Sequence, residues 1–144
     1  MIRQANYNDL VRIAEIEVFN YRLNFYSIFQ NDEYYFQELT VPNLVKKYHE
    51  SIDGFYVYDD GVVMGFMKVV GTELKKLFVE PVLQSNGIGG VLLQYALKEC
   101  SVSCLWVLEK NVRAIEFYQR HGFHVTTTKK LEEDTSEYLV FMEI

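Results

Sequence analysis

Glycine residues cluster where a predicted strand passes through a short loop into a predicted helix, and this cluster constrains the fold more than any other feature. The glycines are Gly87, Gly89 and Gly90, and apolar residues with helical spacing follow them. The first turn of a helix leaves backbone N–H groups without partners, and glycine lets an anion approach them without a Cβ in the way. The pattern therefore predicts either a diphosphate held by main-chain amides or a loop whose glycines only permit a sharp turn.

The loop lacks the residues that two other phosphate-binding motifs require. A phosphate-loop NTPase places Gly-Lys-Ser/Thr at the end of its loop, and no such triplet follows Gly89 or Gly90. The dinucleotide-binding fingerprint needs a further glycine, where this chain has Val91 and Leu92. No lysine or arginine lies within residues 84–90, so backbone groups would have to make most of the contacts to a bound diphosphate.

The other segments predict one mixed α/β domain over residues 1–144, with no linker or repeat to divide it. The expected strands cover residues 1–5, 55–58, 62–70, 74–79, 105–108, 123–128 and 138–144. The first expected helix begins after an N-cap at Asn8 or Asp9 and runs to about Phe29, and a loop follows at 31–33. The other expected helices cover 41–51, the segment that begins at the glycine cluster, and 112–121. The order β-α-α-β-β-β-α-β-α-β-β predicts a mixed sheet with antiparallel and parallel sections.

The first helical region is rich in aromatic residues. Tyr21, Phe25 and Phe29 recur every four residues, which is typical of a helix that faces a core. Aromatic faces also hold cations, so the same residues are compatible with a pocket for a cationic or aromatic acceptor. Further aromatic and acidic residues lie nearby, namely Tyr26, Asp32, Glu33, Tyr34, Tyr35, Phe36 and Glu38.

The composition narrows the classes of function. Lysine and arginine number 14 and aspartate and glutamate number 20, which gives a formal net charge of −6. An acidic chain is a poor nucleic-acid binder, because cationic contacts to phosphates supply most of that affinity. The negative charge suits a cationic acceptor, and it equally serves solubility. No apolar stretch is long enough for a membrane span or a signal segment, so we expect a cytoplasmic protein.

Neither cysteine nor histidine indicates a metal site. Cys100 and Cys104 are too few for a disulfide scaffold, and we expect both to be small buried groups. The histidines are His49, His121 and His124, and none has a second histidine or a cysteine at metal-ligand spacing. We therefore interpret all three histidines as structural or surface residues and expect no metal.

Two segments resemble the motifs of the GCN5-related N-acetyltransferase (GNAT) superfamily. The first motif is Gln/Arg-x-x-Gly-x-Gly/Ala, which Gln84, Gly87 and Gly89 match. The second motif is Asn-x-x-Ala-x-x-Phe-Tyr-x-x-x-Gly-Phe, and every fixed position matches over residues 111–123. The predicted order of elements also fits that family along the whole chain, including a central strand splayed from the next one.

The resemblance implies that the chain uses acetyl-CoA as a co-substrate and needs no metal. Main-chain amides of the glycine loop would hold the diphosphate, and free backbone groups of the central strand would hold the pantetheine arm and the acetyl carbonyl. Asn111 would contact the pantetheine. The cofactor-binding residues implied in this way are Leu77, Phe78, Val79, Gln84, Ser85, Asn86, Gly87, Ile88, Gly89, Gly90, Asn111, Ala114, Phe117 and Tyr118.

Acetyl transfer to an amine needs a base for the amine, an N–H donor for the oxyanion and an acid for the departing thiolate. The resemblance implies that Tyr118 lies near the sulfur as the acid, although the residue is otherwise an aromatic packing group. A backbone N–H near Val79 is the donor that the resemblance implies. Glu73 is the first candidate base, because strict strand alternation puts it on the face of Leu77 and Val79. Glu80 is the second candidate, a water chain ending in either carboxylate would also serve, and Glu73 is otherwise an exposed strand-end residue.

The sequence therefore predicts an N-acetyltransferase that moves an acetyl group from acetyl-CoA to a primary amine by direct attack in a ternary complex. The acceptor would be a small-molecule amine or a peptide. The alternatives are a protein N-terminal or lysine acetyltransferase and a module that senses acetyl-CoA without transferring anything. The C-terminal strands offer an edge for a homodimer.

Overall fold

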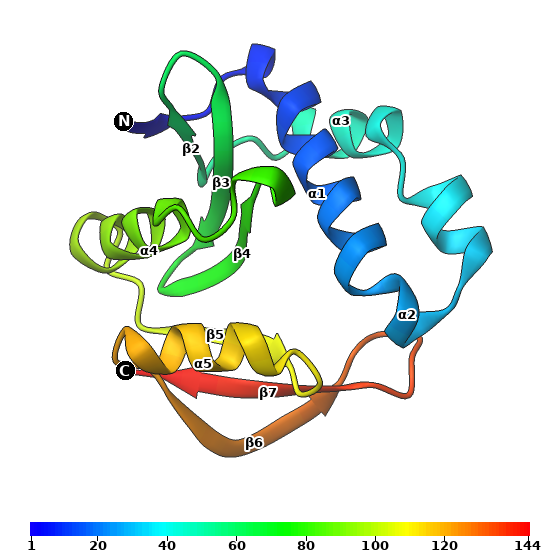
Figure 1. Cartoon of the computed structure of the whole chain (residues 1–144), viewed down its shortest axis with the longest axis vertical. Coiled ribbons are helices and arrows are strands. Elements are labelled where there is room, and N and C mark those ends of the chain that lie inside the picture. The colour runs from blue at the N-terminus through cyan, green and yellow to red at the C-terminus, as the bar shows by residue number, and fades with distance from the viewer.

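A single mixed sheet of seven strands, in the order β1-β2-β3-β4-β5-β7-β6, runs through the computed structural model, which describes residues 1–144 (Figure 1). Neighbouring strands are antiparallel except for β4 and β5, which are parallel. The strands are β1 (Ile2–Gln4), β2 (Phe55–Asp59), β3 (Val63–Val70), β4 (Glu73–Val79), β5 (Cys104–Leu108), β6 (His124–Leu131) and β7 (Tyr138–Glu143). The helices are α1 (Leu10–Asn24), α2 (Tyr26–Phe29), α3 (Val41–His49), α4 (Ile88–Glu99) and α5 (Val112–Arg120). The predicted α/β class with a mixed sheet is confirmed.

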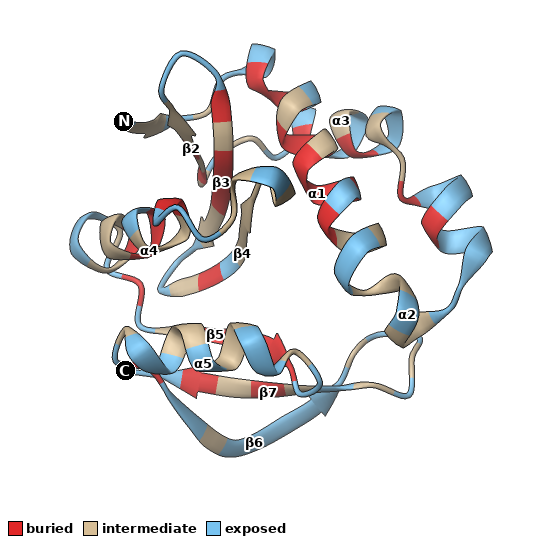
Figure 2. Ribbon diagram, viewed as in Figure 1, coloured by how far each residue is buried: buried red, intermediate tan, exposed pale blue.

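Helices cover both faces of the sheet and form two separate hydrophobic clusters. On one face, α1 and α3 pack against β2 and β3 through residues such as Ile13, Tyr48 and Phe66. On the other face, α4 and α5 pack against the central and C-terminal strands, with Leu92 and Met142 fully buried. Figure 2 shows buried residues along β3 and part of β7, whereas the edge strand β6 is exposed along most of its length. None of the helices has the length and apolarity needed to cross a membrane.

The parallel strands β4 and β5 stay together over a very short distance. They pair only at Glu73 with Cys104 and at Leu74 with Leu105. Beyond these two pairs, β4 continues to Val79 beside β3 alone. The second half of β4 therefore has hydrogen-bonding partners on one side and an open backbone edge on the other.

A β-bulge in β4 corrects the predicted orientation of Glu73. The register between β3 and β4 slips by one residue, which leaves Lys75 as the extra residue. Leu74 consequently packs in the same cluster as Leu77 and Val79, although strict alternation would put it on the other face. Successive strand residues point to opposite faces, so the prediction that Glu73 shares a face with Leu77 is wrong.

The N-terminal helical region is more interrupted than its apolar pattern predicts. Asp9 is the N-cap residue of α1, as predicted, but its side chain makes no capping hydrogen bond there. Asn6 caps the 3₁₀ turn before α1, and its side chain accepts a hydrogen bond from the backbone N–H of Asn8 at 2.9 Å. A 3₁₀ turn (Tyr7–Asp9) precedes α1, which ends at Asn24, and α2 forms a separate turn. A π-helical segment (Tyr34–Glu38) follows the predicted loop.

The aromatic residues of this region pack against the core, as their spacing of four predicts. Tyr21, Phe25 and Phe29 are partly buried against the cluster beneath α1. The ring of Tyr21 lies 5.0 Å from that of Phe25 and 5.6 Å from that of Phe78 in β4, measured between centroids. These contacts hold the end of α1 against the open half of β4.

An ion-pair network ties the first strand to the start of the helical region. The guanidinium of Arg3 donates to both carboxylate oxygens of Asp9, at 2.8 and 2.9 Å, and to Asp59 at 3.0 Å. Asp9 is buried and also accepts from the backbone N–H of Asn6 at 2.8 Å. The hydrogen bonds from Arg3 hold the pKa of Asp9 below its usual range, and the Asn6 N–H adds to the effect.

This pKa shift predicts an acid-dependent loss of stability. A carboxylate whose pKa is lowered in the folded state stabilises the fold above its unfolded value of about 4 and loses that contribution as the pH falls through the folded value. We expect Asp9→Asn to lower the free energy of unfolding by about 1–3 kcal/mol at pH 7, and by less near pH 3. Urea unfolding at both pH values measures the difference, with the exposed Asp60→Asn as the control. A penalty that is the same at both pH values would contradict the prediction.

Candidate active site

A cleft of about 650 Å³ opens where β4 and β5 have diverged, between the glycine loop, α5 and the end of α1. Every predicted cofactor residue except Asn86 lines it, from Leu77 on β4 through the glycine loop to Tyr118 on α5. Segments that lie far apart in the sequence therefore meet around one space. Phe25, one of the aromatic residues considered for an acceptor pocket, also lines it. The lining residues that the sequence did not predict are Asn20, Asn24, Ile28, Leu83, Lys110, Arg113, Arg120 and His121.

The glycine loop presents the N-terminus of α4 to this cleft. Gly87 is the N-cap, with a φ of 84° that residues other than glycine rarely adopt. Gly89 lies in the first turn, and a Cβ added there would stand 3.5 Å from the ring of Phe117. The first turn of α4 thus faces α5 without intervening side chains. Its free N–H groups and the helix dipole favour an anion at this point.

The register of β4 shows which of its backbone groups face the cleft. Glu80 donates its backbone N–H to the carbonyl of Met64 at 2.9 Å, so Glu80 bonds toward β3. Hydrogen-bonded and non-bonded pairs alternate in an antiparallel ladder, and Val79 lies opposite Gly65 as a non-bonded pair. The backbone N–H and C=O groups of Leu77 and Val79 therefore point away from β3, toward the space that β5 has left.

A side-chain clamp that the sequence did not predict holds the end of β4. Asn20 on α1 is buried, and its amide nitrogen donates to the carbonyl of Val79 at 2.9 Å and to that of Ile16 at 2.8 Å. Its amide oxygen accepts from Gln84 Nε2 at 3.0 Å. The Gln84 amide also lies 3.4 Å from the Val79 carbonyl. The glutamine of the first motif thus fixes the loop to α1 and β4, and only the N–H of Val79 is left for a ligand.

A second buried network joins α1 to β4 on the face away from Leu77. The carboxylate of Glu17 is 2% exposed, accepts from the Tyr48 hydroxyl at 2.7 Å and pairs with Lys76 Nζ at 3.1 Å. Sequence patterns gave no signal for it, because a glutamate on an amphipathic helix ordinarily faces water. The network fixes how α1 lies across the open half of β4.

The charge of the cleft differs from that of the whole chain. No aspartate or glutamate lines it, whereas Lys110, Arg113 and Arg120 do. Arg113 reaches across to Ser85 of the glycine loop, with 3.5 Å between Nη2 and Oγ. A protein with a net charge of −6 has therefore gathered cationic groups beside the helix N-terminus that favours anions.

Tyr118 lies on the wall of the cleft formed by α5. Its ring packs edge-on against Phe117 and Phe123, with centroids 5.3 and 5.8 Å apart. Burial among these rings raises the pKa of Tyr118, so its hydroxyl keeps its proton and can act as a donor.

The two candidate bases do not line the cleft. Glu73 lies at the closed end of β4, pairs with Lys75 at 3.3 Å, and is about 20 Å along the strand from Val79. Glu80 directly follows Val79, and its carboxylate pairs with Arg12 at 2.7 Å while remaining 14% exposed. Neither carboxylate directly contacts the space between Val79 and Tyr118.

The three predicted structural histidines occupy different surroundings. His49 stacks on Tyr7 with 4.4 Å between centroids, and His124 lies exposed on β6. His121 lines the cleft, a position that its interpretation as a structural or surface residue did not specify. Nowhere do three or more histidine, cysteine, aspartate or glutamate side chains gather as a metal-binding group.

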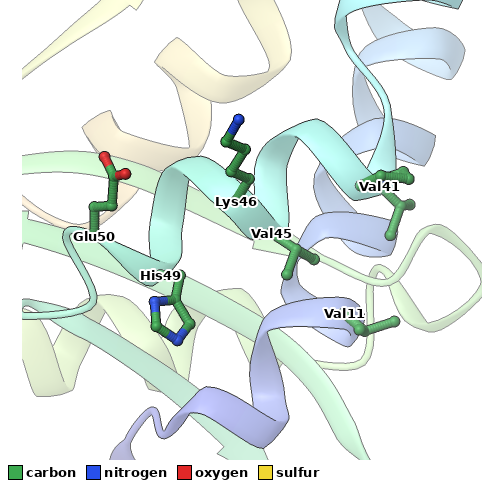
Figure 3. Close-up of a pocket in the computed structure, with 7 residues that line it drawn as sticks. Val11, Val41, Val45, Lys46, His49 and Glu50 are labelled. Atoms are coloured by element: carbon green, nitrogen blue, oxygen red, sulfur yellow. The ribbon is translucent and has the colours of Figure 1, made fainter.

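A second hollow, of about 560 Å³, lies between α1 and α3 (Figure 3). Its walls are Val11, Val41, Pro42, Val45, Lys46, His49 and Glu50. It contains no residue of the glycine loop, β4 or α5. Val41 and Pro42 begin α3 at its wall, but Pro42 has no N–H and the N–H of Asn43 already donates to the Thr40 side chain. The first cleft is therefore the candidate active site.

Comparison with known proteins identifies the class of protein that this fold and cleft define. The Acetyltransferase (GNAT) domain family matches residues 51–125. Peptidyl-lysine N-acetyltransferase YiaC of Escherichia coli strain K12 is 31% identical over 126 residues, which cover 87% of this chain and 84% of that protein. Peptidyl-lysine N-acetyltransferase YjaB of Salmonella typhimurium is 32% identical over 77 residues, 54% of this chain and 53% of that protein. The chain belongs to the GNAT acetyltransferase family and is an acyltransferase of that type.

Solved structures have the same fold. Apo YjaB from Escherichia coli superposes with a TM-score of 0.79 at 22% identity, over 99% of this chain and 95% of that one. The structure of yncA from Salmonella typhimurium with acetyl-CoA superposes with a TM-score of 0.71 at 22% identity, over 100% of this chain and 92% of that one. At this level of identity the likeness extends to the arrangement of strands and helices.

The Asn20 clamp predicts a measurable contribution to stability. Asn20→Ala leaves the carbonyl of Val79 with only its weaker contact to Gln84, so we expect the free energy of unfolding to fall by about 1–3 kcal/mol. Asn24→Ala is the matched control, because Asn24 is exposed and makes a single 3.4 Å contact. Urea unfolding of both variants measures the difference. Equal stabilities for the two variants would refute the clamp.

Proposed function

We propose that the chain binds acetyl-CoA in this cleft and transfers the acetyl group to the side-chain amine of a lysine in another protein. The observation that carries the proposal is the continuity of the cleft. It runs from a helix N-terminus suited to a diphosphate, along an unpaired strand edge, to a tyrosine hydroxyl. A phosphate-bearing thioester on an extended amide arm has this sequence of chemical groups.

The cofactor would bind mainly through backbone groups. The amides of residues 84–90 would receive the diphosphate, and Lys110, Arg113 and Arg120 would add attraction for the phosphates. The pantetheine amides would pair with Leu77 and Val79 as an added strand along the open edge of β4. Asn111 and Phe117 would form the opposite wall.

The reaction would proceed by direct attack of the neutral amine on the acetyl carbonyl. The carbonyl oxygen would accept from the N–H of Val79, whose own carbonyl is already held by Asn20. The C–S bond then breaks as the new C–N bond forms. Tyr118, whose raised pKa keeps its hydroxyl protonated at pH 7, would donate that proton to the departing thiolate. It would regain a proton from the attacking nitrogen, which loses its second proton as the amide forms.

The amine must reach the thioester without its proton. Bringing a lysine amine from a pKa of about 10.4 to its neutral form at pH 7 costs about 5 kcal/mol. Because no carboxylate lines the cleft, we propose that water carries the proton to Glu80, which adjoins Val79 in the chain and is partly exposed. Glu73 is farther away, at the closed end of the strand.

Two features support a peptide lysine as the acceptor. Both curated relatives named above are peptidyl-lysine N-acetyltransferases. Acidic residues also occupy the segments that flank the acceptor side, with Asp32, Glu33 and Glu38 beyond α2, and Glu132, Glu133 and Asp134 in the turn between β6 and β7. Figure 1 shows this turn beside α2, and Glu132 acts electrostatically on both Tyr21 and Tyr34. An acidic approach would attract a lysine-bearing segment.

Incubation with acetyl-CoA and candidate acceptors tests the function directly. We expect thiol release and a mass gain of one acetyl group with an Nα-blocked lysine peptide, and little of either with polyamines or aromatic amines. If the protein acetylated only the small amines, the acceptor would be a small-molecule amine and not a peptide lysine. Calorimetry that detected no binding of CoA or acetyl-CoA would refute the whole assignment.

Tyr118→Phe separates catalysis from binding. Removing the hydroxyl removes the proton donor and leaves the ring, so we expect kcat to fall at least about tenfold while the Kd for acetyl-CoA stays nearly constant. The control is Tyr95→Phe on α4, because Tyr95 packs against Tyr56 and lies outside the cleft. An unchanged kcat would exclude Tyr118 from the chemistry.

The proton path predicts different results for the two glutamates. We expect Glu80→Gln to lower turnover at pH 7 by about tenfold and Glu73→Gln to stay within about twofold of the wild type. The rate should recover at high pH in Glu80→Gln, because there the amine loses its proton without help. If Glu73→Gln gives the larger loss of turnover, the water path ends at Glu73 and not at Glu80.

A further inference from the structure

His121 faces the start of α4 across the cleft. A Cβ added to Gly90 would stand 3.5 Å from Cε1 and 3.6 Å from Nε2 of the imidazole. The ring also packs against Phe117, with 4.8 Å between centroids. The Nε2 edge of His121 therefore lies at the first turn of α4, where the free amides of the glycine loop converge.

A contact with α4 orients the imidazole of His121. Gln94, one turn further along α4 from Gly90, places its amide nitrogen 3.1 Å from Nδ1 of His121. With the Gln94 amide nitrogen as the donor, Nδ1 accepts, and Nε2 is the ring nitrogen that carries an N–H. The imidazole thus presents an N–H donor toward the helix N-terminus.

The surroundings of this donor suit an anion. Arg113 and Arg120 of α5 line the same cleft with His121, and Lys110 lies just before that helix. No carboxylate lines the cleft to compete for the donor. The backbone N–H groups at the start of α4 point to the same place and need an acceptor.

We infer that His121 is a direct ligand of the cofactor's diphosphate, with its Nε2–H donating to a phosphate oxygen held at the start of α4. The inference rests on the proposed function, which assigns the diphosphate to the backbone amides of the loop. It adds a side-chain donor from the residue that follows α5, so that the diphosphate is bound both by the N-terminus of α4 and by the C-cap of α5. Gln94 is a positioning residue, because it acts only by fixing the tautomer of His121.

Three ligands that differ in their phosphates provide the test. CoA carries the diphosphate and a 3′-phosphate, 3′-dephospho-CoA carries the diphosphate alone, and pantetheine carries neither. Calorimetry measures the first two directly, and competition against CoA measures pantetheine. For His121→Ala we expect about tenfold weaker binding of both CoA and 3′-dephospho-CoA, with no change for pantetheine. His121→Gln, whose amide nitrogen can take the place of Nε2, should restore most of the affinity.

Each other outcome overturns the inference in a distinct way. Equal losses for all three ligands would mean that His121 only packs the cleft wall. A loss confined to CoA would assign the residue to the 3′-phosphate, and no loss would remove it from the site. If wild-type protein binds none of the three, the proposed function fails as well.

If His121→Ala does not fold, a variant of Gln94 tests the same inference. Gln94→Leu leaves His121 in place but frees its ring to take either tautomer. We expect 3′-dephospho-CoA to bind about two- to fivefold more weakly, because the hydrogen bond from His121 would form only part of the time. The affinity for pantetheine should not change. Unchanged binding of 3′-dephospho-CoA by Gln94→Leu would contradict the assigned tautomer and with it the inference.

Discussion

The divergence of β4 from β5 is the constraint on which the site depends. A strand in the middle of a sheet ordinarily bonds on both sides, and leaving buried backbone groups unpaired is costly. Here β4 and β5 share only two residue pairs, so the N–H groups of Leu77 and Val79 face a cleft instead of a neighbouring strand. The unpaired edge is stable because one side bonds to β3 and the Asn20 amide occupies the carbonyl of Val79.

Two sets of contacts hold the open edge of β4 in place. The Asn20–Gln84 clamp joins α1, the end of β4 and the glycine loop through a few short contacts. The Glu17–Lys76 pair and the aromatic contact of Tyr21 with Phe78 hold α1 over the other face of the same strand. Together these contacts fix the end of β4 and the glycine loop relative to α1.

Most of the residues that line the cleft between β4 and α5 could be predicted from the sequence, because they lie in short segments with recognisable motifs. Glycines at a helix start and the Asn-x-x-Ala-x-x-Phe-Tyr spacing identify which residues line the cleft, Asn86 excepted. The errors occur where the outcome depends on distant contacts. The bulge at Lys75 turns Glu73 away from the expected face, and no local pattern marks it. Asn20 and His121 lie 101 residues apart and reach the cleft only because α1 and α5 converge there.

By itself, the sequence determined the α/β class and the glycine loop that begins α4, and its resemblance to the GNAT motifs singled out Tyr118 on α5. The class and the loop follow from the intrinsic conformational freedom of glycine and from the periods of helix and strand, which act over a few residues. Only the tertiary structure decided which backbone groups of β4 stay unpaired and which polar side chains meet the cleft. Those outcomes depend on the register between strands and on helix packing, which bring together groups that no local pattern relates.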